Sequence, residues 1–125
     1  INQKNIKIIQ NESNKLNLIQ YYDSHNIFVL PSFTEGYPMV LLEALARKRP
    51  VVIFEDIKHV VGKKKGVFVS QRNYQSFFDT INYIKNNYQN IQDEMSVNRL
   101  PTNKNFINEM KNIISNLNVW LKNKI

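Results

Sequence analysis

The sequence contains no cysteine, only three glycines and four prolines, and no long apolar segment. The lack of cysteine excludes a disulfide framework, a thiolate zinc site and a cysteine nucleophile. So few glycines and prolines exclude collagen-like and linker-like chains. No apolar run approaches the roughly 20 residues that a membrane-spanning helix needs. What remains is a chain of 125 residues, 42% of them hydrophobic, which is enough for one globular domain with its own core.

Basic residues outnumber acidic ones, with 17 Lys and Arg against 10 Asp and Glu, for a net charge of +7. This balance permits binding to phosphates, anionic lipid or nucleic acid, but it does not choose among them. The chain also contains 19 Asn, 15 Ile and 13 Lys. A compositional drift toward these three residues would raise the charge without any partner, so the charge alone assigns no function.

Four short β-branched or apolar runs predict strands over residues 6–10, 27–30, 51–54 and 67–69. The unbroken run at 27–30 is typical of a strand that is buried on both faces. The chain starts with Ile1 rather than Met, and no signal-peptide pattern follows. Four strands are few for a layered α/β domain, so we expect this chain to be a piece of a longer protein.

Apolar residues spaced three and four apart predict helices between and after these strands. The predicted helices cover Leu16–Tyr22, with Ser13 as a candidate N-cap, Met39–Arg47 behind Pro38, Phe77–Tyr88 and Phe106–Leu121. The alternation of strands and helices indicates an α/β layered domain with a mostly parallel sheet, followed by C-terminal helices.

The loop after the second predicted strand carries the groups best suited to chemistry. In an open α/β sheet, ligands bind at the carboxyl ends of the strands, where residues 31–38 turn into a helix. The first turn of that helix presents backbone N–H groups to an anion, and Gly36 lets a ligand come close to the backbone. Glu35 in the loop and Glu43 on the helix are candidate acceptors for sugar hydroxyls. Each residue also has a structural explanation, as a solvated turn residue, a water-facing helix residue or an ordinary turn glycine.

The segment PSFTEGYPMVLLEALARKRPVV, residues 31–52, resembles the donor-site motif of GT-B glycosyltransferases of the family 4 type. Those enzymes share a Pro-Ser-x-x-Glu-Gly loop, a second Glu eight positions after the first, and a following Pro-Val-Val strand. The preceding stretch LNLIQYYDSHNIFVLPS is similar to the family's helix-then-strand approach, and the GVFV run at 66–69 is similar to its glycine-led strand. The resemblance covers roughly residues 6–84.

The resemblance implies that residues 1–100 form a partial, Rossmann-like, nucleotide-sugar-binding domain, the C-terminal half of a GT-B fold. Residues 101–125 are then a C-terminal helix that packs on an N-terminal domain missing from this chain. The implied activity is the retaining transfer of a hexose from a UDP- or GDP-sugar to a glycan or lipid-linked acceptor, as in polysaccharide or lipopolysaccharide biosynthesis. The implied enzyme needs no metal or other cofactor and works in the cytoplasm or peripherally on the inner face of the cell membrane. Alone, the chain is expected to be inactive.

The resemblance also implies roles for individual residues. Glu35 is the expected catalytic residue and contacts the hydroxyls of the donor hexose, while Glu43 accepts hydrogen bonds from the ribose. The other implied donor-binding residues are Ser32 and, through their backbone amides, Gly36, Tyr37, Met39 and Val40.

Three departures from the family pattern bear on this site. Lys48 stands where the family usually has glycine before the Pro-Val-Val strand, so we expect that turn to take another conformation. Pro38 removes one amide from the phosphate-facing turn. The phosphate-binding Arg and Lys of the family lie upstream of the segment that this chain matches, so they are missing from it.

Three other functions stay open on the sequence alone. A non-catalytic binding module would not depend on Glu35 or Glu43. A nucleic-acid-binding domain would use the basic helices and bind with a steep salt dependence, although the chain lacks the aromatic or arginine motif typical of that class. A GT-B sugar-nucleotide epimerase would carry other residues in the donor loop.

Outside the loop, a few polar residues have less specific interpretations. The basic run Lys58–Lys65 suits a diphosphate or anionic lipid headgroups, but a solvated loop is the favoured interpretation. Glu55 and Asp56 end a predicted strand on the ligand side, where they would contact donor or acceptor or simply form a turn. His25 and His59 are isolated and predict no metal site.

Overall fold

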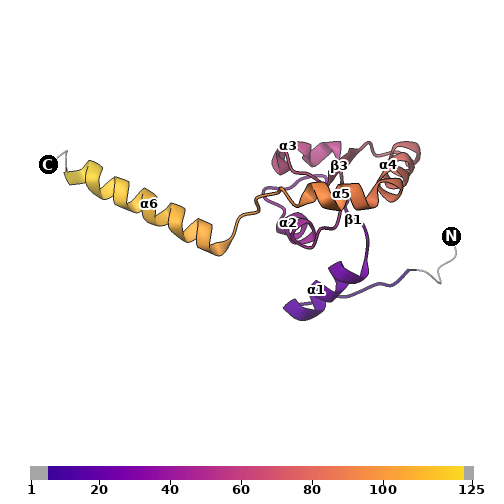
Figure 1. The fold of residues 1–125 in the computed structure, drawn as a ribbon, viewed down its shortest axis with the longest axis horizontal. Helices are drawn as coiled ribbons and strands as arrows, with labels where there is room; N and C mark the ends of the chain where they lie inside the picture. The colour runs from indigo at the N-terminus through magenta and orange to yellow at the C-terminus, as the bar shows by residue number, and fades with distance from the viewer. Residues whose placement is uncertain (1–5, 123–125) are drawn as a thin grey trace.

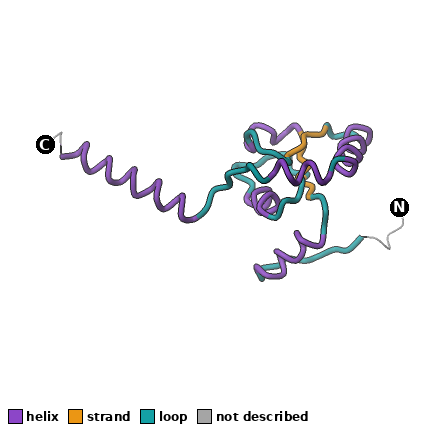
Figure 2. Tube along the Cα trace, viewed as in Figure 1, coloured by secondary structure: helices purple, strands orange, loops and turns teal. Residues whose placement is uncertain are grey.

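A computed structural model of the chain describes residues 6–122, and the side chains of residues 6–117. Helices surround a small sheet, and one long helix extends away from this body (Figure 1, Figure 2). The elements in chain order are α1 (Lys15–Ser24), β1 (Phe28–Leu30), α2 (Met39–Ala46), β2 (Val51–Phe54), the 3-10 helix η2 (Glu55–Ile57), α3 (Lys58–Val61), β3 (Val67–Ser70), α4 (Tyr74–Asn86), α5 (Tyr88–Met95) and α6 (Asn103–Lys122). The predicted α/β class with C-terminal helices is confirmed.

The described sheet has three parallel strands in the order β1-β2-β3. Phe28 lies opposite Val51, and Val51 lies opposite Val67, so the strands run in register and their carboxyl ends meet at one edge. β2 is the central strand, and residues 51–53 are fully buried. Its unbroken apolar run in the sequence follows from this position, because a central parallel strand is covered on both faces and has no free edge.

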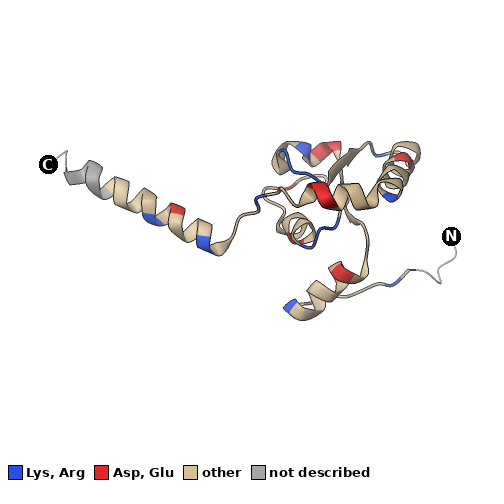
Figure 3. Cartoon of the chain, in the orientation of Figure 1, with Lys and Arg blue, Asp and Glu red and all other residues tan. Residues whose placement is uncertain are grey.

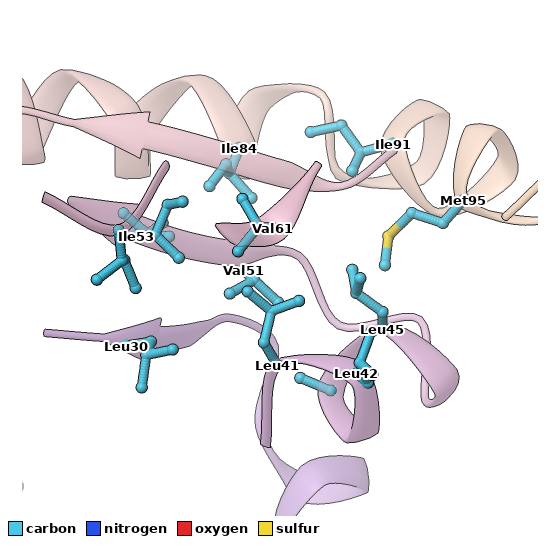
Figure 4. Close-up of a cluster of buried hydrophobic side chains, with 13 residues drawn as sticks. Leu30, Leu41, Leu42, Leu45, Val51, Ile53, Val61, Ile84, Ile91 and Met95 are labelled. Atoms are coloured by element: carbon cyan, nitrogen blue, oxygen red, sulfur yellow. The ribbon is translucent and has the colours of Figure 1, made fainter. Parts of the chain in front are cut away.

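The hydrophobic core gathers around the central strand (Figure 4). Side chains from the helices complete it: Leu41, Leu42 and Leu45 of α2, Ile57 of η2, Val61 of α3, Ile84 of α4, and Ile91 and Met95 of α5. Burying a side chain of this size stabilises the fold by roughly 1.5–3 kcal/mol. This packing holds the strands in place and so fixes the positions from which the loops at their carboxyl ends begin.

Residues 6–10 do not form the predicted strand; the structure gives them no regular secondary structure, and all five are exposed. A strand is stable only when a neighbouring strand takes up its backbone hydrogen bonds. The described sheet pairs only β1, β2 and β3, so the β-branched run at 6–10 has no partner within the described residues. The prediction was wrong because β propensity is local while pairing is not.

The cap of α1 also differs from the prediction. Asn14, not Ser13, is the N-cap, and its Oδ1 accepts hydrogen bonds from the backbone N–H groups of Leu16 at 2.9 Å and Asn17 at 3.3 Å. Asn and Ser are both good caps, so the local sequence allows either residue to start the helix.

Between β2 and β3, the predicted loop contains two short helical turns, η2 and α3. Farther on, the predicted helix 77–88 begins earlier, at Tyr74 after the N-cap Asn73, and ends at Asn86, and a separate helix, α5, continues to Met95, beyond the predicted end. The Asn87 side chain donates to the carbonyl of Tyr83 at 2.8 Å, which ends α4. Asparagine competes for backbone hydrogen bonds in this way, so it interrupts helices that the apolar spacing alone would continue.

Lys48 does not move the turn away from a glycine-like conformation, contrary to expectation. Its φ is 53°, in the left-handed region that favours glycine. Gln92 of α5 and Ser96, which follows that helix, contact Lys48: the Gln92 side chain donates to the Lys48 carbonyl at 3.0 Å, and Lys48 Nζ donates to Ser96 Oγ at 2.8 Å. Tertiary hydrogen bonds thus keep a non-glycine residue in a conformation that costs about 1 kcal/mol.

α6 extends from the body, and its side chains up to residue 117 are all exposed (Figure 1). Six apolar residues, 40–62% exposed, form a stripe with helical spacing: Phe106, Ile107, Met110, Ile113, Ile114 and Leu117. The packing of residues 101–125 on another domain stays a prediction, and the side chains of 118–125 lie outside the described structure. No described helix, α6 included, combines the length and apolar character that crossing a bilayer requires.

Candidate functional site

The candidate site lies at the carboxyl edge of the sheet. β1 ends at Leu30, residues 31–36 form a loop, and α2 begins at Met39 with the buried Pro38 as its N-cap. Because the strands are parallel, the loops that follow β2 and β3 arrive at the same edge. The fold therefore brings the two loops after β2 and β3, distant in sequence, next to the loop at 31–36 that the sequence analysis identified.

Ser32 and Glu35 form the first contact within this loop. The Ser32 hydroxyl donates to Glu35 Oε1 at 2.6 Å, and both residues are half-buried. A short hydrogen bond to a carboxylate is among the stronger ones, so it fixes the direction of the Glu35 side chain. The structure thus places together two of the predicted donor-binding residues.

Gly36 has no structural requirement for glycine. Its φ lies outside the left-handed region, and a Cβ built at this position would meet no atom within 4 Å. Neither the backbone conformation nor internal packing excludes a side chain here. The space in front of Gly36 is open, as close approach by a ligand would require.

The start of α2 faces outward next to Gly36. Tyr37, Met39 and Val40 are 58%, 57% and 40% exposed, although two of them are large apolar residues at the start of a helix. The N–H of Leu41 donates to the Pro38 carbonyl at 3.1 Å, whereas the first two N–H groups of the helix, those of Met39 and Val40, have no acceptor within it. Their partial positive charge suits an anion, and this turn lies directly beside the loop of Glu35.

Glu43 lies one turn farther along α2 and has a different partner. The Tyr22 hydroxyl of α1 donates to Glu43 Oε2 at 3.0 Å. Partial burial of the phenol, and then the hydrogen bond and negative charge of Glu43, raise the pKa of Tyr22 to about 12. Glu43 and Tyr22 line a cavity of about 280 Å³ between α1 and α2. The predicted residues therefore fall into two groups, one around Glu35 and one around Glu43.

Arg72, in the loop after β3, is the residue that the sequence reasoning missed. Its Nε donates to Asp56 Oδ2 at 2.9 Å, and its Nη2 donates to the carbonyls of Pro31 at 3.1 Å and Ser32 at 2.6 Å. Asp56, for which the sequence allowed a ligand contact or a simple turn, pairs with the arginine that holds the loop. The available signal was position: a lone arginine just past a third parallel strand lies at the ligand edge.

Tyr37 and Met39 also line a cleft of about 610 Å³ that reaches Lys64, Arg99 and the start of α6. Lys64 is the member of the predicted basic run 58–65 that lies near these residues, and its Nζ donates to the carbonyl of Val61 at 2.7 Å. A contact between this lysine and a diphosphate stays a prediction.

Four other described cations form ion pairs: Arg47, Arg49, Lys58 and Lys65. Basic residues gather before β2, at 47–49, and before β3, at 63–65 (Figure 3). Asp23 lies between Arg47 and Arg49, and hydrogen bonding and charge, chiefly from Arg47, lower the pKa of that carboxyl. Lys65 pairs with Glu94 at 3.0 Å. Within residues 6–122, no three His, Asp or Glu side chains come close enough together to hold a metal ion.

Comparison with known proteins identifies the family to which this chain is similar. The family described as "Glycosyl transferases group 1" matches residues 1–112. A Haemophilus influenzae (strain Rd) protein, described as an uncharacterized glycosyltransferase, is 41% identical over 56 residues, which cover 42% of this chain and 16% of that protein. A Bacillus subtilis (strain 168) protein, provisionally named a teichuronic acid biosynthesis glycosyltransferase, TuaC, is 32% identical over 63 residues, covering 49% of this chain and 16% of its own length. No solved structure gives a significant match.

Proposed function

Since the chain belongs to the group 1 glycosyltransferases, we propose that it binds the nucleotide-sugar donor in a glycosyl transfer reaction. The observation that carries the proposal is the arrangement of residues 31–40 at the carboxyl edge of the sheet. A carboxylate oriented by Ser32, open space before Gly36 and the first turn of α2 occur there side by side. A hydroxyl-rich sugar attached to a diphosphate needs this combination of acceptors and N–H donors.

In the proposed site, Glu35 accepts hydrogen bonds from the hydroxyls of the hexose. The backbone amides around Gly36, Tyr37, Met39 and Val40 bind the hexose or the diphosphate. Glu43 accepts from the ribose hydroxyls, and its hydrogen bond from Tyr22 occupies Oε2 and leaves Oε1 for the ligand. Pro38 has no backbone N–H to donate, so the first N–H group that α2 itself offers to the ligand is that of Met39.

The proposed reaction moves a hexose from UDP or GDP to an acceptor hydroxyl. The bond between the anomeric carbon and the diphosphate oxygen breaks, and the nucleoside diphosphate leaves with the electron pair. The acceptor oxygen bonds to the same face of the anomeric carbon, which retains the configuration, and the acceptor's proton passes to the departing diphosphate oxygen. The amides of α2 stabilise the charge that develops on the diphosphate, so the proposal assigns no metal or cofactor to this step.

A complete enzyme also needs an acceptor site, which we propose lies on an N-terminal domain. The matched segments span 16% of each of the two relatives, so those proteins are much longer than the segment they share with this chain. The apolar stripe of α6, exposed here, is the surface we propose to pack on that domain. The name of the Bacillus subtilis relative supports a cell-envelope glycan or lipid-linked acceptor, used at the inner face of the membrane.

The test is ligand-observed NMR of this chain with UDP, GDP, ADP and their sugars. We expect one nucleoside diphosphate to bind and the binding to be lost in Glu43→Ala. Glu94→Ala is the matched control, because Glu94 is also an exposed helical glutamate with one side-chain partner but lies on α5. Equal binding by both variants would contradict the assigned site and favour a non-catalytic module.

A further inference from the structure

Arg72 connects the loops that follow all three strands. It lies after β3, pairs with Asp56 after β2, and donates to the two carbonyls at the start of the 31–36 loop after β1. We propose that Arg72 is a positioning residue that holds the 31–36 loop, and through it the Glu35 carboxylate, in the geometry that binds the donor sugar. This inference rests on the proposed function and adds a residue to it.

The guanidinium is held on its faces as well as on its edge. Its Cζ lies 3.7 Å from the ring centroid of Phe33 and 4.5 Å from that of Phe54. A planar, delocalised cation can stack on aromatic rings while its N–H groups donate in the plane, and a lysine ammonium cannot do both. The Arg72 side chain is 29% exposed, so these contacts are partly shielded from water.

Hydrogen bonds hold the turn between β3 and α4 that carries Arg72. The buried Ser70 hydroxyl lies 3.2 Å from Ser76 Oγ, and Ser76 Oγ accepts from the backbone N–H of Gln71 at 3.0 Å. Asn73 caps α4 by accepting from the backbone N–H of Ser76 at 2.9 Å. Arg72 therefore projects from a backbone turn that is already held by hydrogen bonds, so only its side chain must be ordered to reach across the edge.

Ser32 transmits this constraint to Glu35. Its carbonyl accepts from Arg72 at 2.6 Å, while its hydroxyl donates to Glu35 at 2.6 Å. Release of the carbonyl frees the backbone that carries the hydroxyl, so the carboxylate loses its fixed direction. If the loop then takes the binding geometry about a tenth of the time, apparent affinity falls about tenfold.

The test compares Arg72→Gln and Arg72→Lys with the control Lys65→Gln. Lys65 is also a cation paired with one carboxylate, but it precedes β3, at the other edge of the sheet. We expect faster amide hydrogen exchange at residues 33–36 in both Arg72 variants than in the unchanged chain. We expect no change in the exchange rate of these residues in the control. Arg72→Lys keeps the charge opposite Asp56 and should recover only part of the protection.

The ligand measurement separates positioning from general destabilisation. Since Glu35 is assigned to the hexose, Arg72→Gln should weaken binding of the nucleotide sugar about tenfold and change binding of the matching nucleoside diphosphate much less. Equal loss for both ligands, unchanged exchange at 33–36, or full recovery in Arg72→Lys would each overturn the proposal. If the unchanged chain binds no nucleotide, the proposed donor function fails by itself, and the exchange measurement alone decides whether Arg72 orders the loop.

Discussion

The central strand β2 and the helix α6 both present apolar side chains, but those of β2 are buried and those of α6 are exposed to solvent. Residues 51–53 of β2 are completely buried, whereas the six apolar residues of the α6 stripe are 40–62% exposed. Both patterns predict their elements correctly from spacing. The difference shows that periodicity identifies the apolar face of a helix or strand. Only the assembled fold shows whether another part of the protein buries that face.

The largest expected effect tests this contrast directly. Ile53→Ala removes a fully buried side chain from β2 and should lower the free energy of unfolding by about 2–5 kcal/mol, because it leaves a cavity in the core. Ile113→Ala in α6 removes a side chain that is 53% exposed and should change stability by less than about 0.5 kcal/mol. Urea unfolding followed by circular dichroism measures both. Equal losses would mean that α6 is covered in solution.

Two glycines provide a smaller effect that contrasts the core with the candidate site. Gly66 has a φ of 84°, and a Cβ there would lie within 3 Å of the Met95 side chain. Gly66→Ala should therefore cost about 1–3 kcal/mol. Gly36→Ala should leave the thermal midpoint unchanged, since its Cβ would meet open space, yet weaken nucleotide-sugar binding. A stable Gly36→Ala variant with unchanged donor affinity would contradict the ligand approach assigned to Gly36.

The smallest expected effect concerns the α1–α2 contact, which is intermediate between the buried and uncovered regions. The pKa of Tyr22 is raised from 10.0 to about 12, so the folded state favours the neutral phenol. This contribution is fully present below pH 10, the unfolded value, and is lost as the pH rises toward 12. Tyr22 is only partly buried, so we expect roughly 1 kcal/mol after discounting for solvent screening.

The variant Tyr22→Phe separates the stability contribution of the Tyr22 phenol from the alkaline titration of the other tyrosines and the lysines. The difference in unfolding free energy between the two proteins should be constant up to pH 10 and shrink above it. Titration of tyrosinate absorbance in both proteins gives the pKa itself. A difference that stays constant through the alkaline range would contradict the raised pKa, and with it both the partial burial of Tyr22 and its hydrogen bond to Glu43.

Much of the fold could be predicted from local patterns. The runs at 27–30, 51–54 and 67–69 form the three strands within one residue, and α2 begins at the predicted Met39. The run at 6–10 could not be judged locally, because its composition suits a strand but the described sheet offers it no partner. Apolar content indicates that a segment can pair, and pairing depends on residues elsewhere in the chain.

The candidate site divides in the same way. The loop residues Ser32, Glu35 and Gly36 were predicted together because they are adjacent in sequence, and the hydrogen bond between the first two agrees with that grouping. Arg72 was missed because it lies 40 residues from Ser32 and reaches it only across the strand ends. Tyr22 was missed as a partner of Glu43 for the same reason, since 21 residues separate them.

The sequence by itself determined the α/β class, the three strands, the helix α2 and the loop that carries the candidate chemistry, because these depend on spacing and on neighbours along the chain. The tertiary structure alone decided which strand is central, that Lys48 keeps a left-handed backbone, and that Arg72 and Asp56 join the loop of Glu35. These features depend on parallel strands bringing their carboxyl ends to one edge, where side chains from separate loops come within hydrogen-bonding distance.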